Sequence, residues 1–600
     1  MTGDSGGVGI YFLNGQISNS PPNANFSEIM TYAEKLPGVK IVKKPNGGSE
    51  SDPSWLIDDI RDHDLTRVVI AGDSPGFYKS FFTKAMVEQG KDPAGVVLAG
   101  FREYGTHALS SRAKAILDCA VLGVPFELAA QPEETEVNPD TLVIGGGIAG
   151  IQASLEIANS RKKVFLVERT GTIGGHMAMF DKTFPTLDCA ACILTPKMVE
   201  VGQHPDIELM TYCEVKSISG GPGNYKVTIL KKARKVNLAT CIGCGTCSEK
   251  CPGSAPSEFD AGTAMRKSIY IPFPQAVPNK YLIDSESCLY TKNGKCGVCV
   301  KVCPVKDCIN LDEKDEEIEI TVGNIIAATG FKVFDAKRAE QFGYGKFPNV
   351  VTSLEFERLV NAAGPTGGYI KFRGKDKRGN QVFSPAHDEP KSVALIHCVG
   401  SRDENYNKYC SRVCCMYSLK LAHLIKEKMP DADVQEYFID MRAFGKGYEE
   451  FYERIKGEGV HIIRGRTAKV EEANGRLLVR SEDIVNDRLL EKEVDMVVLA
   501  VGLEPREDAA DMADMLGISR SDEGWFLEAN SNTAPTDTFT GGIHIAGLCQ
   551  GPKDIPDTVA QASAAASRVL QSLATGKVKK SIKDLSLEKI DARAKQLAAT

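Results

Sequence analysis

Two runs of cysteine, each ending in Cys-Pro, constrain this 600-residue chain more than any other feature. The first run has the spacing C-x2-C-x2-C-x3-C-P, and the second repeats it with a longer first gap. In two-cluster proteins with this spacing, the fourth cysteine of each run binds the cluster of the other run. Tetrahedral zinc is the alternative, because paired cysteines also bind zinc. The spacing predicts two [4Fe–4S] clusters, one held by Cys241, Cys244, Cys247 and Cys303, the other by Cys288, Cys296, Cys299 and Cys251.

A glycine-rich turn between a predicted strand and a predicted helix indicates a dinucleotide site. Strand Thr141–Ile144 precedes Gly145, Gly147 and Gly150, and Glu168 closes the next predicted strand. Such glycines permit a tight turn, close approach of the backbone to a pyrophosphate, and close packing of the helix. Glu168 would accept hydrogen bonds from the ribose. A glycine turn without a nucleotide is the alternative.

Further segments favour FAD over NAD. Arg169 and the pair Gly174-Gly175 follow Glu168, and a second glycine turn stands at Gly547. This order resembles the thioredoxin-reductase-like flavoproteins, in which an interrupted FAD domain is completed near the C-terminus. That pattern has Asp where Leu548 stands here, so Asp554 is our substitute for the ribityl contact. The other residues expected at FAD are Ile148, Ala149, His176, Thr329, Gly330, Gln550 and Ile555.

A third cysteine group stands where a thioredoxin-reductase-like chain carries a second glycine fingerprint, for NAD(P)H. The predicted strand Ser392–His397 runs into a group of four cysteines instead. Ligands of doubly wound sheets bind at such strand ends, so we predict that a third [4Fe–4S] cluster replaces the nicotinamide. Buried, packed thiols are the alternative. The cysteines are Cys398, Cys410, Cys414 and Cys415.

Three side chains are candidates for redox chemistry. Lys553 can place an ammonium near flavin N5 or N1 and stabilise reduced flavin, or it is a structural lysine. Cys189 and Cys192 form a C-x-x-C, which is either a redox dithiol or a pair packed beside the flavin. Loss of turnover in Cys192→Ala with FAD retained would favour the dithiol. The leftover cysteines are expected to be buried: Cys119, Cys213, Cys308 and Cys549.

Composition excludes several classes of protein. The net charge is −7 and no basic tract is present, which argues against nucleic-acid binding. No apolar run approaches the roughly 20 residues of a membrane span, and the polar segment Met1–Gly9 is unlike a secretory signal. We expect a cytoplasmic protein that is not integral to a membrane, whose 18 cysteines serve metal or redox chemistry.

The predicted organisation is α/β throughout. The strand-like run Ile318–Ala328 resumes the α/β rhythm after the cysteine-rich insertion, and the charged end of the chain is expected to pack weakly. We expect an N-terminal α/β domain (1–135), a first FAD-binding segment (136–235), an inserted ferredoxin domain (236–312), an FAD-domain return and connector (313–390), a degenerate nicotinamide-type domain (391–485), a second FAD-binding segment (486–575) and a tail (576–600).

These motifs together resemble the A subunit of heterodisulfide reductase and its relatives, over roughly residues 140–570. The resemblance is carried by the glycine turn at Gly145, the segment Phe184–Lys197, both ferredoxin runs, Cys398–Asp403, Tyr409–Cys415 and Gln550–Pro556. It implies an FAD subunit that exchanges electrons with a hydrogenase-, formate- or NADH-linked module, with ferredoxin and with a separate catalytic subunit. Flavin-based electron bifurcation and a homodimer within the complex are further implications.

Two departures from the family bear on its partners. The N-terminal strand ends, Tyr11–Asn14 and Ala71–Ser74, carry no cysteines, although this domain often holds a cluster in the family. No cysteine follows Cys549, whereas methanogen members have a C-terminal ferredoxin domain. A bacterial relative is therefore expected, such as the corresponding subunit of class II benzoyl-CoA reductase complexes or of a quinone-linked oxidoreductase.

The leading hypothesis is an electron-transferring flavoprotein subunit of a larger complex. A self-sufficient NAD(P)H-dependent reductase of disulfides or small molecules is the second, and the missing second glycine fingerprint argues against it. A non-catalytic scaffold that relays electrons through its clusters is the third.

Overall fold

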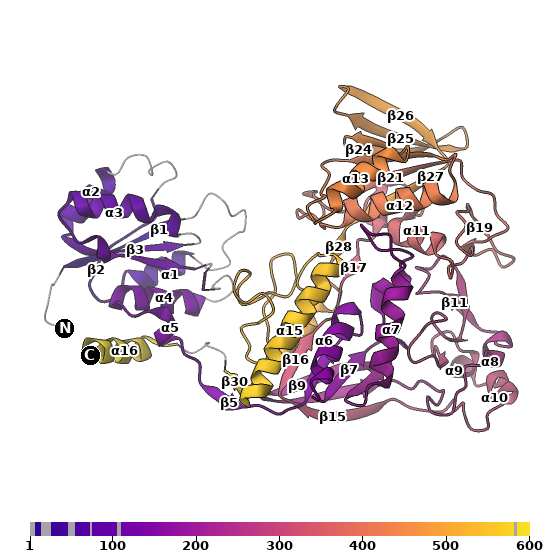
Figure 1. Ribbon diagram of the computed structural model, residues 1–600, viewed down its shortest axis with the longest axis horizontal. Coiled ribbons are helices and arrows are strands. Elements are labelled where there is room, and N and C mark those ends of the chain that lie inside the picture. Colours follow the sequence, from indigo (N-terminus) through magenta and orange to yellow (C-terminus); the bar gives the residue numbers. More distant parts are fainter. Residues whose placement is uncertain are drawn as a thin grey trace. The chain divides into compact units, whose positions relative to one another are not determined.

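The computed structural model describes residues 6–13, 26–45, 54–72, 75–101, 103–104, 110–580 and 585–599. They divide into two compact units, which are described separately below (Figure 1). Unit 1 comprises Met1–Glu136, Leu527–Gly542 and Lys577–Thr600, and unit 2 comprises Val137–Phe526 and Ile543–Gly576. Among the described residues, no helix combines the length and apolar character needed to cross a bilayer.

Unit 1 is built on a four-stranded parallel sheet with the order β2-β1-β3-β4. Val8, Ile10 and Phe12 of β1 pack on the side of α1 and α4, whereas Tyr11 and Leu13 pack on the side of α2 and α3. This alternation places apolar side chains on both faces of a central strand, as a parallel sheet between helices requires. The elements are β1 (Gly7–Leu13), α1 (Phe26–Ala33), β2 (Val39–Lys43), α2 (Ser54–Asp62), β3 (Leu65–Gly72), α3 (Lys79–Glu88), β4 (Val96–Gly100), α4 (Ser110–Leu122) and α5 (Phe126–Ala129).

The expected tail belongs to the unit 1 core, so the prediction of weak packing is wrong. β30 (Lys577–Lys579) pairs antiparallel with β5 (Glu134–Glu136). Ile590 and Ala594 of α16 (Leu587–Ala599) are buried in the same cluster as α4. The segment is rich in charged residues overall, but as a helix it has one apolar face that packs in the core. The expected strand ends at Asn14, Asp73 and Ser74 lie outside the described residues.

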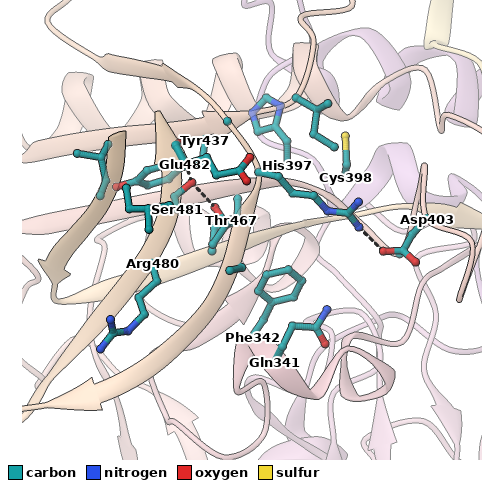
Figure 2. A pocket seen from close by; sticks show the side chains of 18 of the residues that line it. Gln341, Phe342, His397, Cys398, Asp403, Tyr437, Thr467, Arg480, Ser481 and Glu482 are labelled. Carbon is teal, nitrogen blue, oxygen red and sulfur yellow. Dashed lines mark hydrogen bonds and ion pairs between the residues drawn. The ribbon is translucent and has the colours of Figure 1, made fainter. Parts of the chain in front are cut away.

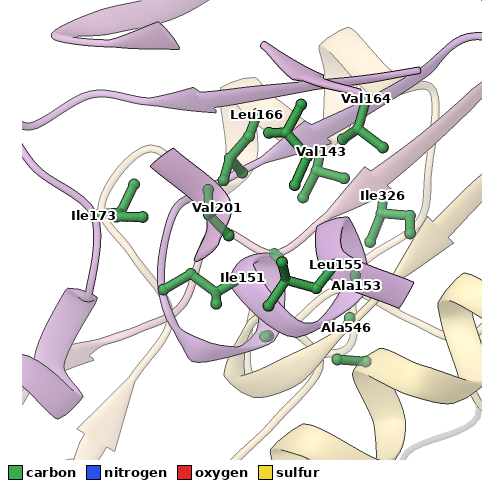
Figure 3. Packing of buried hydrophobic residues seen from close by; sticks show 14 of the residues in the cluster. Val143, Ile151, Ala153, Leu155, Val164, Leu166, Ile173, Val201, Ile326 and Ala546 are labelled. Atoms are coloured by element: carbon green, nitrogen blue, oxygen red, sulfur yellow. The ribbon is translucent and has the colours of Figure 1, made fainter. Parts of the chain in front are cut away.

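The first domain of unit 2 is built on a five-stranded parallel sheet with the order β29-β16-β6-β7-β8. Figure 3 shows a portion of its core, where Val143 and Leu166 of the sheet lie near Ile151 and Leu155 of α6. Strands from distant regions of the sequence complete the sheet, as expected for a two-part FAD domain. The elements are β6 (Thr141–Ile144), α6 (Ile148–Asn159), β7 (Val164–Glu168), α7 (Ala190–Gln203), β8 (Ile207–Thr211), β16 (Asn324–Ala327), α14 (Ala509–Leu516), β29 (Ile543–Ile545) and α15 (Ile555–Thr575).

The run Ile318–Ala328 forms two strands, so the prediction of one is wrong. β15 (Glu316–Val322) pairs antiparallel with β10 (Asn224–Lys231), which pairs with β9 (Cys213–Gly221), whereas β16 enters the parallel sheet. The chain changes sheet at Gly323, where an added Cβ would lie 2.1 Å from the carbonyl oxygen of Asn138. The close backbone contact at this glycine is a tertiary feature that local patterning does not reveal.

The second domain of unit 2 repeats this architecture with the parallel order β18-β27-β21-β22-β23. A three-stranded antiparallel sheet, β24-β25-β26, accompanies it, and β17 pairs with β28. The elements are β17 (Lys332–Val333), β18 (Val350–Thr352), α11 (Ser353–Val360), β19 (Arg373–Lys375), β20 (Gln381–Phe383), β21 (Ser392–Val399), α12 (Cys414–Lys428), β22 (Asp433–Phe438), α13 (Tyr448–Gly457), β23 (His461–Arg464), β24 (Thr467–Ala473), β25 (Arg476–Asp483), β26 (Arg488–Val494), β27 (Met496–Val501) and β28 (Leu503–Glu504).

The cysteine-rich insertion consists of short elements. Its buried cluster combines cysteines of both runs with Val236, Ile269, Ile283 and Ile309. Such a small apolar core is typical of domains that rely on metal binding for stability. The elements are α8 (Thr246–Glu249), β11 (Ser254–Pro256), β12 (Met265–Lys267), β13 (Ile269–Tyr270), β14 (Leu282–Ile283), α9 (Leu289–Asn293) and α10 (Val298–Val302).

Candidate cofactor sites

The glycine turn after β6 has the geometry of a phosphate-binding loop. Gly145 has a φ of +108°, and a Cβ there would lie 2.3 Å from the carbonyl oxygen of Ala328. A Cβ at Gly150 would lie 1.8 Å from the oxygen of Gly145, whereas a Cβ at Gly147 would meet no atom within 4 Å. Gly147 begins α6 without a side-chain cap, which leaves first-turn N–H groups for an anion. The open space at Gly147 therefore fits a pyrophosphate.

Glu168 connects this turn to the end of β7. Its carboxylate accepts a hydrogen bond from the N–H of Gly146 at 2.8 Å and another from the N–H of Thr170 at 2.8 Å. These contacts leave further acceptor lone pairs on both oxygens. Glu168 can therefore hold the turn and accept ribose hydroxyls at the same time.

A cavity of about 760 Å³ opens above the glycine turn. It is large enough for a dinucleotide cofactor, since ligand pockets commonly measure about 300–1,000 Å³. Eight of the expected cofactor residues line it: Gly145, Gly147, Glu168, Arg169, Gly175, His176, Thr329 and Gly330. The others do not line it: Ile148, Ala149, Gly150, Gly174, Gly547, Gln550, Asp554 and Ile555.

Two segments that no motif marked also line this cavity. The first segment is part of the cysteine-rich insertion and contributes Phe259, Asp260, Tyr270 and Phe273. The second segment lies just before α14 and contributes Arg506 and Asp508. The Phe259 and Phe273 rings stack with centroids 4.4 Å apart. Tertiary folding alone brings them here, because nothing in the local sequence links them to the glycine turn. The insertion thus contributes directly to the flavin cavity.

His176 lies partly buried at the cavity wall. Its ring stacks on Phe331 with the centroids 4.2 Å apart. Burial lowers the pKa of His176 to about 4, so the imidazole is neutral at physiological pH. A neutral, stacked ring can exchange a hydrogen bond with a ligand without adding charge.

Lys553 forms its hydrogen bonds within its own loop, whereas Asp554 contacts α15 and Tyr448. The Lys553 ammonium donates to the carbonyl oxygens of Gly547 and Gly551, at 2.7 and 2.8 Å, and to Gln550 Oε1 at 2.9 Å. Asp554 caps α15 by accepting the N–H of Asp557, and it accepts the hydroxyl of Tyr448. The lysine contacts favour its structural role. Flavin tuning by Lys553 and a ribityl contact by Asp554 stay predictions.

The eight cysteines of the ferredoxin runs surround two separate cavities. Each cavity combines three cysteines of one run with the fourth of the other, the crossed arrangement that the spacing predicted. No group of three or more His, Cys, Asp or Glu side chains in the described portion of the chain is spaced for a single metal ion. The first cavity is lined by Cys241, Cys244, Cys247 and Cys303, with Cys308 as a fifth cysteine, and the second by Cys251, Cys288, Cys296 and Cys299.

The third cysteine group also surrounds a cavity, at the carboxyl end of β21. Cys398, Cys410, Cys414 and Cys415 line it together with Arg402. Burial, reinforced by neighbouring thiols, raises the pKa of Cys398 to about 12. The free Cys398 thiol would stay protonated, so binding of iron there must displace its proton. The arrangement fits the predicted third cluster.

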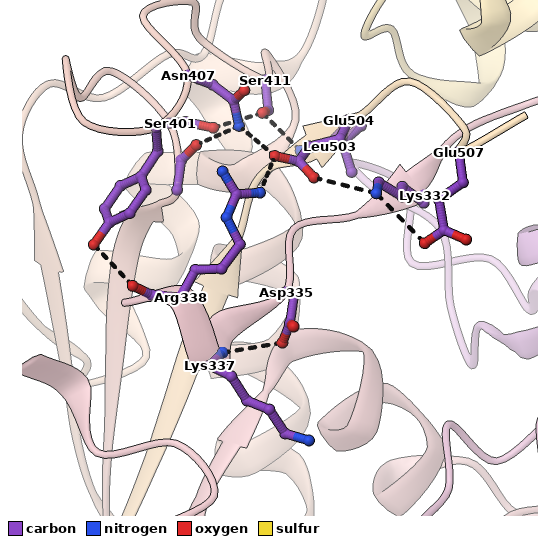
Figure 4. A network of polar contacts seen from close by, with 12 residues as sticks. Lys332, Asp335, Lys337, Arg338, Ser401, Asn407, Ser411, Leu503, Glu504 and Glu507 are labelled. Carbon is purple, nitrogen blue, oxygen red and sulfur yellow. Dashed lines mark hydrogen bonds and ion pairs between the residues drawn. The ribbon is translucent and has the colours of Figure 1, made fainter. Parts of the chain in front are cut away.

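A polar network holds the loop that carries Cys410 (Figure 4). The Ser401 and Ser411 hydroxyls lie 2.7 Å apart, and Ser411 accepts the N–H of Leu503 at 2.9 Å. Glu504 accepts hydrogen bonds from Asn407 at 2.9 Å and from Arg338 at 2.8 Å. β28 thereby fixes the loop from which Cys410 projects.

Cys398 also lines a larger cavity, of about 420 Å³ (Figure 2). His397 lines it and forms a buried contact of 2.6 Å with Glu436. Burial acts to lower the pKa of His397, but Glu436 and Cys415 outweigh it and raise the pKa to about 10. Glycines for a nucleotide turn are not found at this strand end, where Cys398 itself adopts a φ of +58°.

Cys189 and Cys192 lie away from the flavin cavity. They form a disulfide at the start of α7, both residues are exposed, and neither lines that cavity. Their absence from the cavity lining gives no support to the alternative in which the pair packs beside the flavin. Cys119, Cys213, Cys308 and Cys549 are buried free thiols, as expected.

Comparison with known proteins agrees with this architecture. A family model described as "FAD dependent oxidoreductase" matches residues 140–181, and one described as "4Fe-4S dicluster domain" matches residues 240–307. Thioredoxin reductase of Lactococcus lactis aligns at 14% identity with a TM-score of 0.40, over 73% of this chain and 100% of that one. The protein is an FAD-dependent α/β oxidoreductase whose flavin domain is built from two separate stretches of chain, with an inserted dicluster ferredoxin domain.

Relatives along most of the chain define the family more closely. The chain is 45% identical over 563 residues to the A subunit of the H(2):CoB-CoM heterodisulfide,ferredoxin reductase of Methanothermobacter marburgensis, covering 92% of this chain and 82% of that one. It is 41% identical over 611 residues to a heterodisulfide reductase A-subunit-like protein of Archaeoglobus profundus, covering 95% and 87%. The chain belongs to the family of heterodisulfide reductase A subunits, and the resemblance seen in its motifs is confirmed.

Proposed function

We propose that this protein is an electron-transferring subunit of a heterodisulfide-reductase-like complex, holding FAD, two [4Fe–4S] clusters in the insertion and a third at Cys398. The observation that carries the proposal is the presence, in one compact unit, of a dinucleotide cavity and of three cavities that are each lined by the four cysteines of one predicted cluster. Flavin takes up electron pairs and releases single electrons, and each cluster carries one.

The residues of this chain position those groups. First-turn N–H groups of α6 bind the pyrophosphate at Gly147, and Glu168 braces the turn while it accepts ribose hydroxyls. Phe259 and Phe273 close the cavity from the insertion and exclude water from it. Because the insertion forms this wall, its clusters are held near the flavin. The ferredoxin pair then serves as the low-potential branch.

Partners are proposed from the names of the relatives. The name of the Methanothermobacter marburgensis relative contains hydrogen, heterodisulfide and ferredoxin. The name of a relative from Methanococcus maripaludis contains hydrogen or formate. The partners we propose here are accordingly a separate catalytic subunit, ferredoxin, and a hydrogen- or formate-linked input module. The Cys398 group occupies the strand end where a self-sufficient reductase would bind NAD(P)H, which disfavours that alternative.

Iron counting tests the cofactor content. Anaerobically purified protein should contain about twelve irons per FAD, as three four-iron clusters require. Cys414→Ser should lower the count to about eight, whereas Cys549→Ser, at a buried thiol outside the three cavities, should leave it unchanged. Eight irons in the wild-type protein would refute the third cluster.

Native purification tests the complex. Mass spectrometry of every subunit that stays bound should identify heterodisulfide-reductase-like, quinone-linked or aryl-CoA reductase partners. A solitary protein that oxidises NADH would overturn the proposal.

A further inference from the structure

The disulfide Cys189–Cys192 is a redox group that the flavin and cluster sites leave unused. Among the described cysteines, twelve are the predicted cluster ligands, which line three cavities, and four are other buried free thiols, of which Cys308 also lines the first cavity. Cys189 and Cys192 are the remaining pair, and both are exposed. An exposed disulfide is accessible to thiolates from solution, which is the first requirement for thiol–disulfide exchange.

The start of α7 favours a thiolate at Cys189. This residue is the N-cap of a 14-residue helix, and its Sγ accepts the N–H of Cys192 at 3.2 Å. Unpaired N–H groups and the helix dipole stabilise negative charge at such a position. Opening the disulfide would thus yield a nucleophilic Cys189, with Cys192 one turn along the helix to resolve a mixed disulfide.

The disulfide is not needed to hold the local fold. It links residues only three apart, and the stabilisation from a cross-link is small for so short a loop. Backbone hydrogen bonds close the preceding turn independently: Thr183 N–H to the Asp188 oxygen at 2.8 Å and Ala190 N–H to the Asp181 oxygen at 3.0 Å. The bond can therefore open and close without unfolding α7.

One apolar side chain lies exposed beside the pair. Ile193, which follows Cys192 in α7, is 40% exposed and can contact the apolar flank of a reacting disulfide molecule.

We propose that Cys189 and Cys192 form a dithiol–disulfide pair that exchanges electrons with external disulfides. In the reduced pair, the Cys189 thiolate attacks one sulfur of the external disulfide and displaces the other as a thiolate. Cys192 then attacks Cys189 Sγ, re-forms the protein disulfide and releases the second thiolate. Two electrons pass to the external disulfide, the two protons of the pair follow, and an external dithiol reverses the sequence. The site goes beyond the proposed electron-transfer function and needs neither FAD nor clusters.

Thiol titration of the anaerobic holoprotein tests this exchange. The protein is reduced with dithiothreitol, desalted and treated with Ellman's reagent, and the Cys189→Ser/Cys192→Ser double variant supplies the background. The reduced wild type should release two more equivalents of thionitrobenzoate than the double variant and retain none. Cys192→Ser should release one more equivalent of thionitrobenzoate than the double variant and retain one thionitrobenzoate group as a mixed disulfide on Cys189. Cys189→Ser should react about tenfold more slowly than Cys192→Ser, because it lacks the helix-stabilised thiolate.

Two outcomes would overturn the exchange site. One is a disulfide that dithiothreitol leaves intact in the native protein, shown by peptides without maleimide label at Cys189 and Cys192. The other is release from the wild type equal to that from the double variant. FAD and iron are measured in every variant, so a failure of the proposed cofactor content is seen separately from a failure of exchange.

Discussion

The glycines of the β6–α6 turn have different tolerances for a side chain. Gly147 has an ordinary φ of −75° and open space where its Cβ would point, whereas Gly150 packs against the Gly145 oxygen. Gly147 therefore leaves room for a ligand, and Gly150 allows the helix to approach the strand. The glycine pattern predicts these two roles in this order, and the close packing at Gly150 is observed in the structure.

Gly147→Ala should fold normally and bind FAD at least about tenfold more weakly, equal to about 1.4 kcal/mol, because its methyl group occupies the phosphate space. Gly150→Ala should instead destabilise the protein by about 1–3 kcal/mol, through overpacking. Urea unfolding of the FAD-free proteins and fluorescence titration with FAD separate the two effects. If Gly147→Ala binds FAD as tightly as the wild type, the pyrophosphate does not lie there.

The spacing of the cysteines predicted which of them come together. The twelve cysteines proposed as cluster ligands line three cavities in the groups that were expected, and the binding of clusters there stays a prediction. Prediction failed for Phe259 and Arg506, which reach the flavin cavity only through tertiary folding. No periodicity or motif could have identified them.

At the scale of elements, β28 and the loop before α12 depend on one carboxylate. The Glu504 side chain is 9% exposed and binds Arg338 and Asn407, while Glu507 is 85% exposed and pairs with Lys332 at 3.5 Å. The two glutamates thus form a natural matched pair, one buried and one exposed.

Glu504→Ala should lower the free energy of unfolding by about 1–3 kcal/mol, because it removes the buried carboxylate that accepts hydrogen bonds from Arg338 and Asn407. The loosened loop should also lose the third cluster, taking about four irons per FAD with it. Glu507→Ala should change stability by less than about 0.5 kcal/mol and retain all iron. Denaturant unfolding and iron analysis measure both effects. Full iron retention in Glu504→Ala would show that the network does not hold Cys410 in place.

A buried carboxyl in α4 makes unit 1 sensitive to pH. Burial, with Asp591 of α16 nearby, raises the pKa of Asp118 to about 6 from 3.8, although Tyr32 donates to both of its oxygens at 2.9 Å. Because the folded pKa lies above the unfolded one, the cost of ionisation is absent below about pH 4. It grows as the pH rises to about 6 and is complete above that.

Asp118→Asn should therefore stabilise unit 1 at pH 8 by about 2–3 kcal/mol, and the gain should vanish toward about pH 4. The amide oxygen can still accept the Tyr32 hydroxyl. Asp58→Asn, on the exposed side of α2, serves as the control and should have little effect at either pH. Thermal unfolding across this pH range gives the comparison. A variant less stable than the wild type at pH 8 would mean that the carboxylate is net stabilising.

Element prediction was most accurate where buried strands are continuous apolar runs. β6 has the predicted bounds, and β21 begins at the predicted residue, Ser392. It failed at Gly323, where one apolar run serves two sheets, and at α16, whose apolar stripe is narrow among charges. In both cases the deciding contacts come from distant regions of the chain.

At the scale of the whole molecule, unit 1 is assembled from three separate stretches of chain. The sequence predicted a continuous N-terminal domain, because local patterns do not show that residues 527–542 and 577–599 leave the flavin domain. Ile590 of α16 is fully buried in the unit 1 core, so this core depends on residues far from the N-terminus in sequence.

Ile590→Ala should destabilise unit 1 by about 2–4 kcal/mol, because it removes a buried side chain whose site cannot fully collapse. Hydrogen exchange should accelerate in β1, β3 and α4, while amides of β6 and α6 keep their protection and FAD and iron contents stay at wild-type values. Leu597→Ala, on the same helix but 36% exposed, should change little. Each unit has its own hydrophobic clusters, and that is why we expect separate unfolding. Equal acceleration in both units, with loss of FAD, would show instead that the protein unfolds as one cooperative body.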